Sequence, residues 1–258
     1  YKVGESTGEI AADYLIRKQQ LSHYLYEHHL PKNGLRYFFD NQERSLPLEE
    51  MSEIGSNSLP FLPAFQIDRA RIETDLLEMN RQEGVQVHTG VQATGIELGS
   101  GGQLHEFRTR TDAGEVSHRC RWLIDASGRT ALLAKAQGLQ VREDTHRIGA
   151  SWGRFEGVAD VDAVDLPAFR SRVRHTTRRL STLHFWYPGY WFWVIPLRGG
   201  LTSIGVTGEV VTQRRELRSP EGFMAFVREH RALRELVAGA KNVDFGSFNQ
   251  IAYGTRRF

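Results

Sequence analysis

The stretch Tyr190-Trp-Phe-Trp-Val-Ile-Pro196 carries the most information about the fold. It is short and rich in aromatic and β-branched residues, and it ends at a proline, which is typical of a strand that stops at a sheet edge. Runs of the same kind lie on both sides, at 181–186 and 201–209, and Arg198-Gly-Gly200 supplies the turn to the second. We therefore predict an antiparallel sheet around residues 190–196, with residues 148–155 as a further strand.

The first half of the chain mixes helix and strand patterns. Apolar residues at helical spacing predict one long amphipathic helix over residues 8–29 and a second helix from residue 68 to Gly84. Asp112-Ala-Gly114 indicates a hairpin between strands at 104–111 and 115–120. Further strands are expected at 34–39, 85–87, 91–98 and 122–125, a loop at 56–63, and a helix that begins after Ser219.

Helices and strands are thus mixed, and the antiparallel signals are concentrated in the second half. The predicted fold class is α/β of a mixed α+β kind, in which a three-layer α/β part is interleaved with an antiparallel sheet layer.

The composition narrows the class of protein. The chain has 258 residues, 40% of them hydrophobic and 25% charged, with a net charge of +2, which excludes a disordered or fibrous protein and gives no reason to expect nucleic-acid binding. One cysteine, Cys120, excludes an internal disulfide and suits a cytoplasmic location. No apolar run approaches the roughly 20 residues of a membrane span. The histidines lack the spacing of a zinc site, so no metal is expected.

Asp125-Ala126-Ser127-Gly128-Arg129 follows the apolar run that starts at Trp122. A glycine at such a turn lets the backbone approach a ligand closely, and a carboxylate at the end of a strand can accept a hydrogen bond from a ribose or ribitol hydroxyl. The alternative is an ordinary strand-to-helix turn capped by the aspartate.

Two further segments combine polar groups with a helix start. Gly4-Glu5-Ser6-Thr7 precedes the first expected helix, where free backbone N–H groups suit an anion or the edge of a ring, although an ordinary N-cap explains it equally well. Gln66 and Arg69 lie near the start of the second, and a guanidinium matches the oxygens of a pyrophosphate. The alternative for Arg69 is a surface ion pair with Asp68 or Glu73.

Trp191-Phe-Trp193-Val-Ile195-Pro196 fits the W-x-W-x-I-P signature of flavin-dependent halogenases, although the two tryptophans alone would suit an aromatic core. The other three segments follow the order of that family. From Val3 to about Gly254, the chain resembles the central part of a tryptophan-halogenase-like enzyme of the FAD-dependent monooxygenase superfamily. The resemblance implies that Gly4 to Thr7, Gln66, Arg69 and Asp125 to Gly128 bind FAD.

The resemblance also implies a catalytic lysine. Lys32, followed by the aromatic run that starts at Tyr37, has the position of the lysine that lies between flavin and substrate in the family. A buried lysine can hold a hypohalous species as an amine nucleophile or as a hydrogen-bond donor. A solvated lysine or one that caps the preceding helix is the alternative. Pro31 and Asn33-Gly34 differ from the neighbours of this lysine in the tryptophan-specific branch.

The implied reaction is the halogenation of an electron-rich aromatic. It needs FAD reduced by a separate flavin reductase, oxygen, and chloride or bromide, and its small aromatic substrate is free or bound to a carrier protein. A hydroxylase or an isoprenoid reductase of the same fold, and a non-catalytic fragment or accessory flavoprotein, remain alternatives. The arginine-rich run at 170–179 is expected to be a solvated loop. The other interpretation is a docking strip for an acidic carrier protein or for the phosphorylated handle of a substrate.

The family's G-x-G-x-x-G unit is absent from the sequence, and we interpret the chain as an excerpt whose missing segments precede Tyr1 and follow Phe258. The expected division assigns residues 1–30 and 63–145 to an incomplete FAD-binding part and residues 31–62 and 146–215 to a substrate-side sheet. Residues 216–258 are expected to form a helix and a strand that return to the FAD-binding part.

Overall fold

The computed structural model describes residues 3–143, 145–249 and 253–255. The chain forms two compact units, one from Tyr1–Thr74 with Arg147–Gln250 and one from Asp75–His146 with Ile251–Phe258. Helices and strands are mixed in both, so the predicted fold class is confirmed. The expected division into an FAD-binding part and a substrate-side part stays a prediction. None of the helices built from described residues is both long and apolar enough to cross a membrane.

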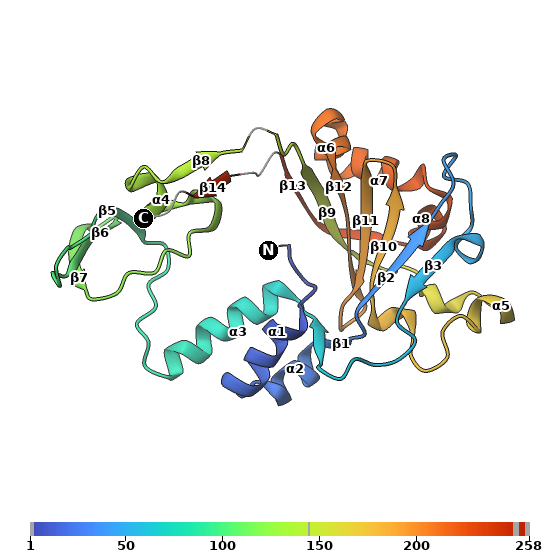
Figure 1. Cartoon of the computed structure of the whole chain (residues 1–258), viewed down its shortest axis with the longest axis horizontal. Helices are drawn as coiled ribbons and strands as arrows, with labels where there is room; N and C mark the ends of the chain where they lie inside the picture. Colours follow the sequence, from blue (N-terminus) through green and yellow to red (C-terminus); the bar gives the residue numbers. More distant parts are fainter. Residues whose placement is uncertain (1–2, 144, 250–252, 256–258) are drawn as a thin grey trace. The chain divides into compact units, whose positions relative to one another are not determined.

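The first unit is built on a seven-stranded sheet (Figure 1). Only β10 and β2 pair in parallel; the other neighbours are antiparallel. The predicted sheet around residues 190–196 is therefore confirmed, with β11 at its centre. In spatial order the strands are β13 (Lys241–Phe248), β9 (Gly149–Glu156), β12 (Leu201–Gly208), β11 (Tyr190–Pro196), β10 (Thr182–Tyr187), β2 (Leu35–Phe39) and β3 (Ser52–Gly55).

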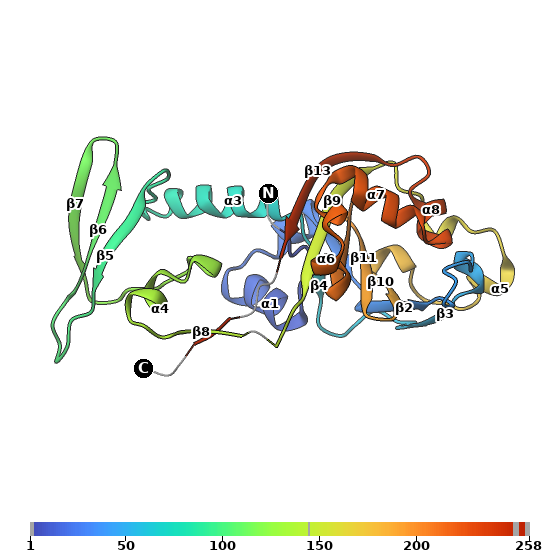
Figure 2. The same cartoon turned by 90° about the horizontal axis from the view of Figure 1, so that it is seen from above.

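Three helices cover one face of this sheet: α6 (Glu209–Gln213), α7 (Pro220–Arg228) and α8 (Arg231–Leu236) (Figures 1 and 2). The predicted N-cap is confirmed, because Ser219 Oγ accepts a hydrogen bond from the Gly222 N–H at 3.1 Å. Phe223 and Phe226 of α7 are fully or almost fully buried and belong to one cluster with Phe192 of β11. The largest hydrophobic core of the unit therefore lies on this face.

Side chains of the other face lie in register across the strands. Tyr37 of β2 is opposite His184 of β10, which is opposite Trp193 of β11, and the row continues through Gly205 to Trp152 of β9. Gly205 makes room for an indole, since a Cβ there would lie 2.1 Å from the ring of Trp193. This face is consequently lined by aromatic rings with polar edges, and the helices α6 to α8 do not cover it.

The long helix expected over residues 8–29 is wrong. The segment forms α1 (Glu9–Asp13), a π-helical turn η1 (Tyr14–Lys18) and α2 (Ser22–His28), with Gln20 in the left-handed region at φ 56° between them. Ala12 and Leu25 are the only buried apolar residues here, and Ile10 is 89% exposed. The apolar residues do not form a continuous buried stripe, so packing does not hold one straight helix together.

A two-stranded pair joins this helical segment to the sheet. β1 (Leu30–Lys32) pairs antiparallel with β4 (Ala64–Gln66), and the predicted strand at 34–39 follows as β2. The short helix η2 (Leu48–Glu50) precedes β3. Two short 3-10 helices and one short α-helix lie between β9 and β10: η4 (Val161–Ala163), α5 (Pro167–Arg170) and η5 (Arg178–Leu180). Another short helix, η6 (Arg215–Arg218), precedes α7.

The second unit contains a three-stranded antiparallel sheet of β5 (Gln92–Glu97), β6 (His105–Thr111) and β7 (Gly114–Cys120), which confirms the predicted hairpin. Helix α3 (Arg69–Gln82), whose residues up to Thr74 belong to the first unit, agrees with the predicted helix, and Gly84 after it has φ 85°, as expected of a C′ residue. η3 (Gly128–Thr130), α4 (Leu132–Ala136) and β8 (Gln140–Arg142) follow the sheet, and β14 (Tyr253–Thr255) pairs with β8.

Two strands predicted for this unit are not formed. Residues 85–87 and 122–125 have no strand structure, and neither pairs with a neighbour in the described part of the chain. Trp122 and Ile124 are 87% and 86% exposed. A strand is stabilised by hydrogen bonds to an adjacent strand and by burial of its side chains, and both are missing at these positions.

Candidate functional site

The candidate site is built around β4, which has a segment paired along each edge. Lys32 of β1 lies opposite Ala64 on one edge. On the other edge Glu5 and Thr7 form backbone hydrogen bonds with Ile67 and Phe65, at 2.7 and 3.0 Å. The predicted segment 4–7 and the predicted Lys32 are therefore brought together, although they are 25 or more residues apart in the sequence.

Lys32 is buried, with 7% of the residue exposed. Its Nζ donates a hydrogen bond to the Thr7 carbonyl at 2.7 Å. Burial lowers the pKa of this amine below its ordinary value, and the nearby carboxylate of Glu9 only partly opposes the shift. A solvated lysine is therefore not what the structure shows, and the amine is closer to its neutral, nucleophilic form than an exposed lysine is.

Hydrogen bonds attach this region to the start of β10. Thr182 Oγ1 donates to Ser6 Oγ at 2.8 Å, and the Thr182 N–H donates to the Gly34 carbonyl at 3.2 Å. The segments that carry Ser6 and Lys32 are thus fixed against the end of the sheet from which His184 extends, two residues further along β10.

His184 is a candidate residue that the motifs did not indicate. It is 9% exposed and stacks on Tyr37, with ring centroids 5.3 Å apart, and the centroid of the Trp191 ring lies 4.9 Å from that of His184. Burial, helped by the positive charge of Lys32, lowers the pKa of His184 to about 4, and its Nδ1 has no hydrogen-bond partner among the described residues. Side chains alternate between the two faces along β10, and this alternation places His184 on the same face of the sheet as Trp191 and Trp193.

The tryptophan motif forms a wall next to His184. Trp193 is 8% exposed and donates a hydrogen bond from Nε1 to Ser203 Oγ at 3.2 Å. Trp191 stacks on Trp186 at 5.8 Å, and Trp186 is 39% exposed. Ile195 is packed in a cluster with Trp193, and Pro196, the last residue of β11, is half-buried. Trp193 is thus a buried core residue, as the alternative expected. Trp191 is half-buried and Trp186 is exposed, so this part of the wall is accessible to solvent.

Two buried oxygens near β4 have no partner in the part of the chain that is described. Glu5 is fully buried; its Oε2 accepts from the Gly4 N–H at 3.1 Å, while Oε1 accepts nothing. Burial raises the pKa of Glu5. Gln66 donates from Nε2 to the Arg179 carbonyl at 3.1 Å, and its Oε1 is likewise unpaired. Buried acceptors without partners are costly, so both suit a bound group that supplies N–H donors.

Arg69 is engaged within the protein. It forms an ion pair with Glu73 and donates a hydrogen bond to the Val3 carbonyl at 3.0 Å. Gly4 has φ 115°, and a Cβ there would lie 2.7 Å from the Arg69 guanidinium. The ion-pair alternative is therefore present in the structure, and a role of Arg69 toward a pyrophosphate stays a prediction.

The segment from Asp125 to Gly128 lies in the second unit. Asp125 accepts hydrogen bonds from the N–H groups of Ser127 and Leu133, both at 2.8 Å, and the hydrogen bond from the Ser127 side chain is the main reason why its pKa lies below the usual value. Ala126 and Gly128 are exposed, and Gly128 has φ 59°. The segment is a capped glycine turn, and its role in binding a cofactor stays a prediction.

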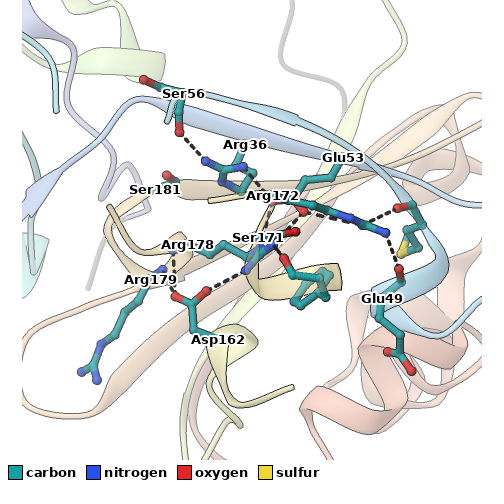
Figure 3. A network of polar contacts seen from close by, with 12 residues as sticks. Arg36, Glu49, Glu53, Ser56, Asp162, Ser171, Arg172, Arg178, Arg179 and Ser181 are labelled. Carbon is teal, nitrogen blue, oxygen red and sulfur yellow. Dashed lines mark hydrogen bonds and ion pairs between the residues drawn. The ribbon is translucent and has the colours of Figure 1, made fainter. Parts of the chain in front are cut away.

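The arginine-rich run is only partly a solvated loop. Arg170 and Arg174 are exposed, as expected, but Arg178 is 1% exposed and lies in a network of ion pairs with Glu53 and Asp162 (Figure 3). The expectation is wrong for Arg178 because two carboxylates and a backbone carbonyl replace the water that its guanidinium would otherwise need. No cluster of potential metal ligands occurs among the described side chains.

Comparisons with curated proteins point in one direction. No family model matches the chain. The flavin-dependent halogenase chlA of Dictyostelium discoideum is 27% identical over an alignment that covers 100% of this chain and 46% of that protein. A 1H-pyrrole-2-carbonyl-[peptidyl-carrier protein] chlorinase of Pseudomonas fluorescens is 25% identical over 69% of this chain and 38% of its own length. The chain thus spans about half the length, or less, of these relatives.

Solved structures show the same fold. The flavin-dependent halogenase CmlS matches 99% of this chain and 44% of its own, with a TM-score of 0.75 and 18% identity. The halogenase PltM in complex with phloroglucinol and FAD matches 99% of this chain and 54% of its own, with a TM-score of 0.79 and 18% identity. The predicted resemblance to flavin-dependent halogenases is confirmed by these comparisons.

Proposed function

We propose that the protein containing this chain is an FAD-dependent oxidoreductase that halogenates an electron-rich aromatic compound. The observation that carries the proposal is the buried Lys32 amine, which is held at the Thr7 carbonyl and has a lowered pKa. The similarity to chlA and to the structure of PltM supports the reaction class.

The residues around β4 fit a flavin. The unpaired Oε1 atoms of Glu5 and Gln66 are buried acceptors that suit N–H groups of an isoalloxazine ring. Ser6 and Thr7 complete this side of the site, and Arg69 is the proposed contact of the phosphates. FAD bound here and reduced by a separate reductase would supply hypohalous acid from oxygen and chloride or bromide.

Lys32 is the proposed catalytic residue. Its amine would hold the hypohalous acid in one of two ways. It would donate a hydrogen bond to the oxygen, or its lone pair would attack the halogen, so that an N–halogen bond forms, the O–halogen bond breaks and the oxygen leaves as water with a proton from the amine. The hydrogen bond to Thr7 fixes the nitrogen, and burial excludes water that would compete for the oxidant. Both effects direct the halogen toward one acceptor.

The aromatic face of the sheet is the proposed substrate side. Tyr37, His184 and Trp191 form a continuous group of ring contacts that suits a flat aromatic compound. Curated and structural relatives give two forms of such a substrate, a pyrrole on a peptidyl-carrier protein and the free phenol phloroglucinol. We propose a small aromatic substrate of one of these two forms for this protein.

The test uses the whole protein with FAD, a flavin reductase and phloroglucinol, with and without chloride or bromide. We expect a product whose mass increases by one halogen for hydrogen, and only when halide is present. A hydroxylated product that forms equally well without halide would instead identify a monooxygenase. A protein that binds no FAD under these conditions would exclude both reactions.

A further inference from the structure

Residues 176–181, named the strap here, run alongside the residue that follows Lys32. The Asn33 N–H donates to the Leu180 carbonyl at 2.5 Å, and Ser181 Oγ donates to the Asn33 carbonyl at 3.2 Å. Asn33 Nδ2 donates to Thr176 Oγ1 at 2.8 Å. Asn33 is fully buried, so both its backbone and its side chain are fixed by the strap.

The strap is in turn held by Arg178. Its Nε and Nη2 donate to the two carboxylate oxygens of Glu53 at 2.8 and 3.0 Å, which is the forked geometry of a strong pair. Its Nη1 donates to Asp162 at 3.0 Å and its Nη2 also to the Phe169 carbonyl at 2.6 Å (Figure 3). The guanidinium therefore joins the strap to three separate segments.

Glu53 connects this clamp to the edge of the sheet. It lies on β3 and also accepts a hydrogen bond from Arg36 of β2 at 2.6 Å, and both side chains of this second pair are nearly inaccessible to solvent. Removing one member of a buried group of this kind leaves an uncompensated charge, so breaking these ion pairs is costly. The ion pairs therefore hold the strap in place, and the strap restricts the backbone at Asn33.

We propose that Arg178 is a positioning residue for Lys32, which it does not touch: it fixes the strap, the strap fixes Asn33, and Asn33 keeps the Lys32 amine buried against the Thr7 carbonyl. The importance of this positioning for catalysis rests on the proposed function of Lys32. The physical effect of Arg178 on the Lys32 amine does not depend on that function. Gln66 of β4, the strand that pairs with β1, also contacts the strap, because its Nε2 donates a hydrogen bond to the Arg179 carbonyl.

Arg178→Lys tests the proposal, because it keeps the charge and removes the fork. Arg172→Lys is the matched control: Arg172 contacts the same Glu53 at 3.7 Å and the carbonyls of Glu49 and Met51, but lies outside the strap. The readout is the rate at which acetic anhydride modifies Lys32, followed by peptide mass spectrometry over a range of pH. The exposed Lys135 and Lys241 are internal standards.

We expect Arg178→Lys to increase the limiting rate of Lys32 modification about tenfold and to move the titration of Lys32 to higher pH. Arg172→Lys should leave both quantities unchanged. An Arg178→Lys variant with a native circular dichroism spectrum and the wild-type modification rate would overturn the proposal.

Thr176→Val is the second variant, in case Arg178→Lys does not fold. It removes only the acceptor of the Asn33 amide, and we expect a smaller change of Lys32 in the same direction. Unchanged labelling of Lys32 in this folded variant would contradict the role of the strap. The labelling needs no FAD, so a positive result in a protein that halogenates nothing would refute the proposed function and support the positioning role.

Discussion

The two faces of the seven-stranded sheet differ in composition although they share the same strands. Phe185 and Phe192 point to the helix-covered face and are fully buried in an apolar core. Their neighbours His184 and Trp193 point to the other face, where a ring nitrogen is left without a described partner. Because successive side chains of a strand point to opposite faces, adjacent residues contribute either to the hydrophobic core or to the candidate site. Substitutions on the two faces should therefore have different consequences.

The largest effect on stability is expected on the helix-covered face. Phe192→Ala removes a fully buried ring that contacts Phe226 across the core, and it should lower the free energy of unfolding by about 3–5 kcal/mol. Urea denaturation followed by circular dichroism measures this loss. A midpoint equal to that of the wild type would show that this face does not carry the core.

A smaller loss is expected where the aromatic face is packed most tightly. Gly205→Ala places a methyl group on the ring of Trp193 and should cost about 1–3 kcal/mol, with a change in tryptophan fluorescence as the indole moves. Gly239→Ala is the control, because its Cβ would lie 3.5 Å from the nearest atom, an ordinary van der Waals contact, and its φ is outside the left-handed region. Equal stability of the two variants would contradict the close approach of Trp193 to β12.

The smallest effect concerns pH. The pKa of His184 is lowered to about 4 in the folded protein from 6.5, so the unfolded chain binds the proton first as the pH falls. Stability should therefore decrease from pH 7 to pH 5, by about 1–2 kcal/mol for this histidine. His184→Phe keeps a ring beside Tyr37 and should remove that part of the decrease in urea titrations at the two pH values.

His230, on the helix-covered face, has a pKa of about 4 for the same reason, burial, and it contributes its own acid-dependent loss. The effect of His184→Phe should consequently be partial. An unchanged pH dependence in this variant would show that His184 is not buried in its neutral form.

Local patterns were sufficient for much of the fold. The hairpin at Asp112-Ala-Gly114, the Ser219 N-cap and the strands on either side of residues 190–196 depend on neighbours in the sequence, and all of them are present. The strand expected at 122–125 failed because a strand also needs a partner along its edge. The helix expected at 8–29 failed because periodicity does not reveal whether a stripe will be covered.

The candidate site was predicted less completely. Motifs identified Lys32 and the segment from Gly4 to Thr7, which the fold brings together through β4. They could not identify His184, whose significance comes from three strands in register, or Arg178, which belongs to a run that looks solvated in the sequence. Burial of the Arg178 charge depends on the carboxylate of Glu53, which is 125 residues away in the sequence.

The most direct test of the account is the activity of Lys32→Met in the whole protein, supplied with FAD, a reductase, halide and phloroglucinol. We expect halogenated product to fall by a factor on the order of 100 or more while oxygen consumption stays within about twofold of the wild type, because the lysine directs the oxidant and does not form it. Halogenation at the wild-type rate by Lys32→Met would contradict the central claim.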